Sequence, residues 1–156
     1  MRDRIVGLAF TACACLAASA SFGEELPKQV QELLVTLQSG KPAERAAAAR
    51  ILGELGASAR AAVPDLGSAL GDGEGEVRRN AARSLGDIGP PAKLAVPALL
   101  KTLKDSDWQV RQASAYALGR IGSREASAGL EAAKKDTNEN VKRAAKQALK
   151  ALKQKS

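Results

Sequence analysis

Residues 72–89 read DGEGEVRRNAARSLGDIG, and the pattern returns 33 residues later as DSDWQVRQASAYALGRIG over residues 105–122. The two stretches share an initial aspartate, a Val-Arg pair and a Leu-Gly-x-Ile-Gly ending. Self-similarity at one fixed period is the sequence signature of a repeat architecture. The chain is therefore interpreted first as an array of repeated units.

The period extends beyond these two stretches in both directions. Upstream, Arg45, Leu52 and Gly53 occupy the places of Arg78, Leu85 and Gly86. Downstream, a fourth copy follows after a deletion of two residues. This spacing predicts four repeats, at about residues 24–56, 57–89, 90–122 and 123–156.

Each unit carries two apolar stripes with spacings of three and four residues, which is the period of an amphipathic helix. In the third unit the first stripe runs Val96, Leu99, Leu103, and the second contains Val110 and Leu118. Aromatic residues make up only 3% of the chain, a composition that suits closely packed helices better than sheets. We therefore predict an all-α fold, a right-handed α-solenoid of about eight helices.

Glycines and prolines recur at fixed places in the period. Gly53, Gly86 and Gly119 fall inside the second helices, where glycine costs about 1 kcal/mol against alanine, so their recurrence predicts a tight helix crossing. Residues 56, 89 and 122 are glycines just past the last apolar position, which is typical of a helix C-terminus. Pro64 and Pro97 predict that the first helices start or kink nearby.

The quoted stretches resemble HEAT repeats, of the subgroup named after bilin lyases (the phycobilisome-lyase HEAT-like repeats), here in a small exported bacterial form. The resemblance covers the chain after its N-terminal segment, with the first repeat departing most. It implies that turn aspartates and helix arginines form a structural ladder of charge-assisted hydrogen bonds between repeats. The ladder residues would be Asp72, Arg78, Asp105, Arg111, Asp136 and Lys142.

The resemblance also implies that the second helices line a concave surface. The residues one, five and nine positions after each ladder cation would face it, with a basic lean and one tyrosine. Tyrosine and arginine are enriched in binding hot spots. The predicted partner-binding residues are Arg50, Arg79, Arg83, Gln112, Tyr116, Arg120 and Arg143.

Lysines replace small residues in the last repeat. Lys146, Lys150 and Lys153 occupy the places of Ala115, Gly119 and Gly122 on one helix face, which ends the stack as a polar cap. Residues 24–133 carry 14 basic and 14 acidic side chains, so the excess positive charge lies in residues 134–156. This end is either a solvated cap or a surface that binds anionic lipid, polysaccharide or protein.

The N-terminus has the pattern of a secretory signal over residues 1–23. Arg2 and Arg4 precede an apolar stretch that ends at small residues suited to cleavage. Cleavage predicts a periplasmic or extracellular protein without a transmembrane helix. An alternative is a lipoprotein tether through Cys13, one of only two cysteines.

Catalysis is not expected from the residue types present. The chain has no histidine, and both cysteines lie within the predicted signal, so metal sites and nucleophilic dyads of the usual kinds are excluded. We expect no cofactor, no nucleic-acid partner and a monomer. The leading hypothesis is a protein-binding scaffold of the cell envelope. The alternatives are an electrostatic binder of the anionic envelope surface and, more weakly, a lyase-like or chaperone-like enzyme accessory.

Trp108, the only tryptophan, lies near the turn of the third repeat. Two interpretations remain open at this stage. The side chain packs against the neighbouring turn, or it is exposed as an anchor for a partner.

Overall fold

The computed structural model describes residues 27–154, so the predicted signal peptide and the Cys13 tether lie outside the described residues. Between residues 27 and 154 it contains eight α-helices, three short 3-10 helices and no strand. The elements are α1 (Lys28–Ser39), α2 (Pro42–Glu54), η1 (Gly56–Ala62), α3 (Val63–Ala69), α4 (Gly75–Ile88), η2 (Pro90–Ala95), α5 (Val96–Thr102), α6 (Trp108–Ile121), η3 (Arg124–Ala126), α7 (Ser127–Ala133) and α8 (Glu139–Gln154).

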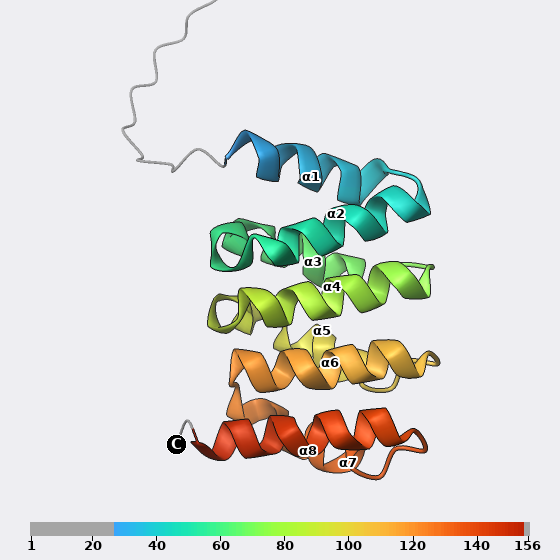
Figure 1. Ribbon diagram of the computed structural model, residues 1–156, viewed down its shortest axis with the longest axis vertical. Helices are drawn as coiled ribbons and strands as arrows, with labels where there is room; N and C mark the ends of the chain where they lie inside the picture. Colours follow the sequence, from blue (N-terminus) through green and yellow to red (C-terminus); the bar gives the residue numbers. More distant parts are fainter. Residues whose placement is uncertain (1–26, 155–156) are drawn as a thin grey trace, which may run out of the picture.

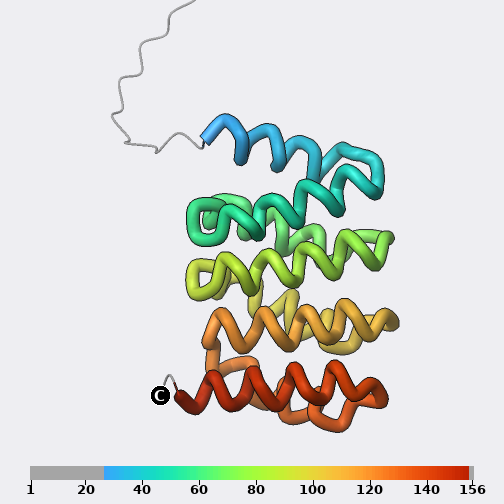
Figure 2. The backbone as a smooth tube through the Cα atoms, viewed as in Figure 1, coloured from blue at the N-terminus to red at the C-terminus, as the bar shows by residue number. Residues whose placement is uncertain are grey.

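The helices stack in four layers along the longest axis of the molecule (Figure 1). The second helices α2, α4, α6 and α8 lie side by side in one layer, and α3, α5 and α7 lie behind them (Figure 2). Helix α4 packs between α2 and α6, and α6 packs between α4 and α8. The four-repeat α-solenoid architecture predicted from the 33-residue period is therefore confirmed.

The first helices of repeats two and three begin at a proline-containing turn, as predicted. Helix α3 starts at Val63 and α5 starts at Val96, each with proline in its first two positions. Each follows a 3-10 segment that changes the chain direction before the α-helix starts. The fourth repeat keeps this arrangement, with η3 before α7, although it has no proline there. Proline therefore suits the bend but is not required for it.

Buried leucines from every layer form one continuous core. Leu52, Leu85 and Leu118 on the second helices are fully buried, and so are Leu66 and Leu99 on the first helices. Burial of each such side chain contributes about 1.5–3 kcal/mol. The core is thus spread evenly along the stack, which gives the second helices a rigid backing.

Glycines allow the second helices to cross closely, as the sequence predicts. A Cβ atom added at Gly53 would lie 2.8 Å from the Cα of Ser84. A Cβ at Gly86 would lie 2.8 Å from the Cα of Ala117. At Gly119 the corresponding distance, to the Cα of Ala148, would be 2.7 Å. All of these are shorter than real Cβ contacts, so each crossing excludes a side chain.

A ladder of arginine–aspartate pairs joins consecutive repeats. Arg78 donates from Nε and Nη2 to the two carboxylate oxygens of Asp105, at 2.8 and 2.9 Å. Its Nη1 donates to the backbone carbonyls of Asp72 and Gly73, at 2.9 and 3.0 Å. Arg45 pairs with Asp72 and Arg111 with Asp136 in the same way. Each guanidinium therefore ties its own turn to the turn of the following repeat.

The ladder carboxylates are held in their ionised form. Hydrogen bonds from Arg45 and Arg111 lower the pKa of Asp72 and Asp136 respectively. Partial desolvation opposes the shift at Asp105, but the hydrogen bonds from Arg78 and from the backbone N–H of Asp107 outweigh it, and the pKa is lowered. Bidentate, charge-assisted pairs of this kind are stronger than neutral hydrogen bonds.

The prediction that Lys142 belongs to the ladder is wrong. Its ammonium group donates to Glu139 in the same helix, at 2.6 Å, while Asp136 is held by Arg111. The physical reason is the direction of the ladder: each cation reaches forward to the next turn. Within residues 27–154 no further turn follows Lys142.

Candidate protein-binding groove

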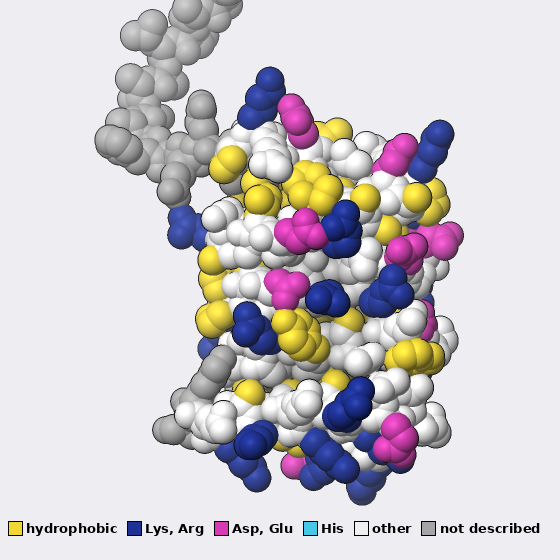
Figure 3. All heavy atoms as spheres, in the orientation of Figure 1, with side chains coloured by type: hydrophobic (Ala, Val, Ile, Leu, Met, Phe, Trp, Pro, Cys, Tyr) yellow, Lys and Arg dark blue, Asp and Glu magenta, His cyan; other side chains and the backbone are white. Residues whose placement is uncertain are grey.

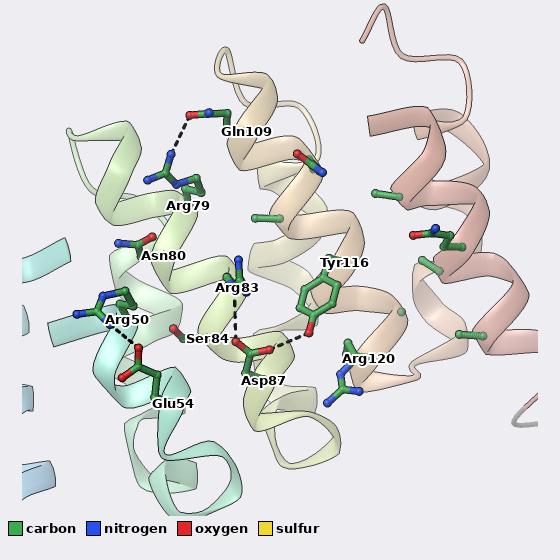
Figure 4. A pocket seen from close by; sticks show the side chains of 17 residues that line it. Arg50, Glu54, Arg79, Asn80, Arg83, Ser84, Asp87, Gln109, Tyr116 and Arg120 are labelled. Atoms are coloured by element: carbon green, nitrogen blue, oxygen red, sulfur yellow. Dashed lines mark hydrogen bonds and ion pairs between the residues drawn. The ribbon is translucent and has the colours of Figure 1, made fainter. Parts of the chain in front are cut away.

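A groove of about 910 Å³ crosses the four second helices. It contains four arginines, two carboxylates and one tyrosine, and the rest of its lining consists of amides, a serine and small residues. The view in Figure 4 shows α2, α4 and α6 each presenting side chains into it. The lining residues are Arg50, Glu54, Arg79, Asn80, Arg83, Ser84, Asp87, Gln109, Gln112, Ala113, Tyr116, Gly119, Arg120, Ala144, Gln147, Ala148 and Ala151.

Tyr116 and Asp87 form the centre of the groove. The tyrosine hydroxyl donates to Asp87 Oδ1 at 2.8 Å, which links α6 to α4 (Figure 4). Partial burial and this hydrogen bond raise the pKa of the Tyr116 hydroxyl. The residue as a whole remains 39% exposed. The groove therefore presents an aromatic face whose orientation is fixed before any partner arrives.

Three groove arginines, Arg50, Arg79 and Arg83, form ion pairs, and the side chain of Arg83 is the most exposed of the three. Its Nε lies 3.8 Å from Asp87 Oδ2, beyond hydrogen-bond distance, and 73% of its side chain is exposed. Arg50 pairs with Glu54 one turn along α2. The guanidinium of Arg83 thus keeps most of its donors available on the groove surface.

Arg79 bridges two repeats at the upper part of the groove. Its Nη1 donates to the side-chain oxygen of Gln109 at 2.9 Å, and its Nη2 lies 3.4 Å from Glu76. The bond to Gln109 orients the guanidinium across the boundary between α4 and α6. Like the Tyr116 bond, it depends on a neighbouring repeat being present.

Three polar residues of the groove, Asn80, Ser84 and Gln109, were not predicted from the sequence. Asn80 donates to the backbone carbonyl of Ala46 at 3.0 Å, and Ser84 donates to that of Ala49 at 2.7 Å. Both bonds join α4 to α2 along the floor of the groove. The only available signal was that the third repeat has alanine at the two equivalent places, which is too weak to assign a contact.

Six of the seven predicted partner-binding residues line this groove, and Arg143 does not. Arg143 is exposed in the first turns of α8 and donates to Asn140 at 2.9 Å. Its counterpart Arg79 is held by a glutamine from the next repeat, and no next repeat exists in the described chain beyond α8. The role of the other six in binding stays a prediction.

The groove has no arrangement typical of a catalytic centre in the part that the structure describes. Its carboxylates, Glu54 and Asp87, come from different repeats and are each bound to groove side chains. No cluster of three or more His, Cys, Asp or Glu residues suited to a metal occurs within residues 27–154. The groove can offer hydrogen bonds, cations and one aromatic face to a ligand.

A second distinct surface, the basic end, is formed by the outer face of α7, α8 and the turn between them. It comprises Lys134, Lys135, Lys142, Lys146, Lys150 and Lys153 with two carboxylates, Glu131 and Glu139. In Figure 3 the dark blue side chains gather along this end of the stack. The ion pairs here among the described residues are Lys134 with Glu131 and Lys142 with Glu139, both at 2.6 Å. Hydrogen bonds from these lysines lower the pKa of both glutamates.

Trp108 opens α6 and is 37% exposed. It is absent from the lining of the groove, so it does not extend that surface.

Among residues 27–154, no helix combines the length and the apolar character needed to cross a bilayer.

The chain is similar in structure to several solved helical repeat proteins. An engineered protein superposes with a TM-score of 0.67 at 26% identity, over 80% of this chain and 62% of that one. Human deoxyhypusine hydroxylase, solved in complex with glycerol, gives a TM-score of 0.66 at 28% identity, over 84% of this chain and 45% of that one. The present chain therefore spans less than two thirds of the length of either.

A third structure shows the shared fold alone, because its identity is low. The complex of CpcE and CpcF of phycocyanin lyase from Nostoc gives a TM-score of 0.52 at 20% identity, over 76% of this chain and 96% of that one. No curated protein matches the chain. The family model described as HEAT repeats matches residues 30–96 and 93–150, which is most of the described chain. The layered helix pairs, the glycine crossings and this match together show that the chain belongs to the HEAT-repeat family.

Proposed function

We propose that this protein is a non-enzymatic adaptor of the bacterial cell envelope that binds a protein partner in the groove of its second helices. The observation that carries the proposal is the composition of the groove. Its cations are all arginine, and an oriented tyrosine lies at its centre. Arginine and tyrosine are the side chains that most often dominate protein-binding energy.

The rigidity of the groove also supports this function. Tyr116, Arg79 and Ser84 are each fixed by a hydrogen bond to a neighbouring repeat. A pre-oriented surface loses less side-chain entropy on binding than a mobile one. The exposed guanidinium of Arg83 can donate two hydrogen bonds to a carboxylate of the partner in a bidentate pair.

The non-enzymatic and envelope parts of the proposal rest on the sequence. The chain contains no histidine, and the apolar stretch within residues 1–23 follows Arg2 and Arg4 as in an export signal. Export would place the solenoid in the periplasm or outside the cell. A HEAT-repeat stack suits either place because its stability comes from the leucine core and the ladder.

A capture experiment with two matched variants tests the proposal. The groove variant changes Arg79, Arg83, Tyr116 and Arg120 to alanine. The control changes Lys93, Leu94, Lys101 and Lys104 to alanine, which also removes three cations and one large exposed apolar side chain. Each tagged protein is expressed in its native cell, and the captured proteins are compared by quantitative mass spectrometry.

We expect the groove variant to lose a partner that the unmodified protein and the control both recover. The loss should reach tenfold or more, since truncation of one hot-spot residue typically costs about 2 kcal/mol. Equal recovery of every captured protein by the groove variant and the control would overturn the assignment.

A further inference from the structure

The basic end differs in chemistry from the groove. Its cations are lysines, whereas those of the groove are arginines. Lysine is a compact, strongly hydrated point charge, while arginine forms planar paired contacts. Lysine is also depleted in protein–protein interfaces, where arginine and aromatic residues are enriched. The two surfaces are therefore suited to different kinds of partner.

The lysines form a straight stripe on a single helix. Positions 142, 146, 150 and 153 of α8 follow each other at spacings of four, four and three, which places them on one face. At a rise of 1.5 Å per residue the stripe is roughly 16 Å long. Lys146, Lys150 and Lys153 are exposed, and the adjoining Lys134 and Lys135 lie in the turn that follows α7.

Capping alone does not require this charge. A terminal repeat must present polar residues to water, and a balanced mixture of lysine and glutamate would serve. The basic end has six lysines and only two glutamates, whereas residues 24–133 carry equal numbers of basic and acidic side chains. The excess of one sign on one face therefore calls for an explanation beyond solubility.

The basic end also lacks the features of a protein or nucleic-acid site. The large exposed apolar residues of the described chain are Val35, Leu94, Trp108 and Tyr116, and none lies on α7 or α8. Without an aromatic residue there is no platform on which bases can stack and no anchor for a desolvated pocket. A hydrated anionic plane needs neither, because it attracts lysines by long-range electrostatics.

We infer that the basic end docks the solenoid on an anionic lipid bilayer, with the axis of α8 lying parallel to the membrane. The docking is electrostatic, without insertion of apolar side chains. The layers then stand on the bilayer, with the first repeat farthest from it. Three interhelical steps of 8–10 Å place α2 about 24–30 Å above α8. In this orientation the groove opens sideways and remains accessible to a partner.

Vesicle co-sedimentation of the full chain tests the docking. The vesicles are phosphatidylcholine alone or phosphatidylcholine with phosphatidylglycerol. One variant changes Lys146, Lys150 and Lys153 to glutamine. The control variant changes Lys93, Lys101 and Lys104 to glutamine, which alters net charge equally at another exposed site. Circular dichroism and a thermal melt establish that both variants fold.

We expect binding only to vesicles that contain phosphatidylglycerol. It should fall roughly a hundredfold in the basic-end variant, at about tenfold or less per lysine, and stay nearly unchanged in the control. Raising the salt from about 0.1 M to about 1 M should abolish it, because the screening length falls from about 10 Å to about 3 Å.

Three results would overturn the inference. One is equal binding by the unmodified protein and the basic-end variant, which would place any membrane contact elsewhere in the chain. Another is an equal loss in both variants, which would make net charge alone responsible. The third is binding to an anionic polysaccharide such as heparin without binding to the vesicles, which would identify a different occupant.

The orientation has its own test. Cys13 and Cys15 are changed to serine, and a fluorophore is attached to a new cysteine at Gln154 or at Gln38. Lipids that carry a quencher should quench the label at residue 154, beside the basic end, and not the label at residue 38 in the first repeat. Equal quenching at the two positions would exclude an end-on orientation.

Discussion

At the scale of single residues, the absence of a side chain is as important as its presence. Gly119 lies against Ala148 so closely that one added methyl group would overlap the neighbouring backbone. Gly67, in contrast, has no atom within 4 Å of the place where its Cβ would be. The two positions therefore give the same substitution opposite consequences.

Gly119→Ala should destabilise the protein by about 1–3 kcal/mol, because an overpacked helix crossing must separate to relieve the overlap. Gly67→Ala should stabilise it by about 0.5–1 kcal/mol, since alanine is the better helix former and fits without contact. Urea unfolding followed by circular dichroism measures both. A Gly119→Ala variant as stable as the unmodified protein would contradict the close crossing.

The ladder residues make a second prediction at this scale. Arg78→Lys loses the planar fork that bonds Asp105 and two backbone carbonyls, so we expect a loss of about 1–3 kcal/mol at neutral pH. Arg83→Lys, on the same helix but largely exposed, should change stability by less than about 0.5 kcal/mol. Urea unfolding of the two variants and the unmodified protein gives the comparison.

The pH dependence of the ladder follows from the lowered pKa of Asp105. A carboxylate with a lowered pKa in the folded state stabilises the fold above its unfolded pKa of about 3.9, and this contribution is lost as pH falls through the folded value. The electrostatic part of the Arg78→Lys cost should therefore be constant from pH 7 to about pH 5 and shrink below about pH 4. If Arg78→Lys lowers the free energy of unfolding equally at pH 7 and pH 3, the ionised Asp105 does not contribute to the ladder as described.

At the scale of elements, the sequence predicts the order and packing of the helices better than the 3-10 segments and the polar side-chain contacts. The recurring leucines and glycines face the interior or the crossing, where the constraint is the same in every copy, so their positions in the structure follow from the period. The 3-10 segments η1, η2 and η3 do not follow from it, because Pro64 and Pro97 mark where α3 and α5 begin but do not indicate a 3-10 segment before them. The buried bond between Thr102 and Ser114, at 2.6 Å, likewise occurs in one repeat only.

The errors at the groove and the ladder both fall on α8, the last helix of the chain that the structure describes. Arg143 and Lys142 occupy repeated positions, but each position acquires its role from the repeat that follows. The sequence pattern shows which residues of the repeats are equivalent, but it does not show which residues of the neighbouring repeat they contact. Asn80 and Ser84 were missed for the same reason, since their bonds reach back to α2.

Interchangeable repeats give an element-scale prediction. Deletion of residues 90–122 would bring Asp136 opposite Arg78 and Ala148 opposite Gly86, in place of Asp105 and Ala117. The pairing and the close crossing are both preserved, so the three-repeat protein should fold as a helical monomer. Its melting temperature should be lower, because one set of nearest-neighbour contacts is gone.

Circular dichroism and analytical ultracentrifugation can establish the state of this deletion protein. A control deletion of residues 90–116 removes a number of residues that breaks the register, and it should fail to fold cooperatively. Cooperative folding of both proteins, or of neither, would contradict the nearest-neighbour account.

At the scale of the whole molecule, two surfaces of different chemistry are held by one rigid stack. The groove crosses the faces of the second helices, and the basic end lies across the last layer, at one end of the long axis (Figures 1 and 3). The core and the ladder join all the layers, so the two surfaces are parts of one continuous stack. A partner in the groove and a membrane at the basic end can thus be engaged together without a conformational change.

Site-specific photo-crosslinking in the native cell tests the central claim, recognition of a protein in the groove. A photoreactive amino acid is placed at Gln112, which lines the groove, or at Leu94, which is 85% exposed and lies outside it. We predict a discrete covalent adduct with one protein from position 112 and none from position 94. Absence of any adduct from position 112, or the same adducts from both positions, would contradict the account.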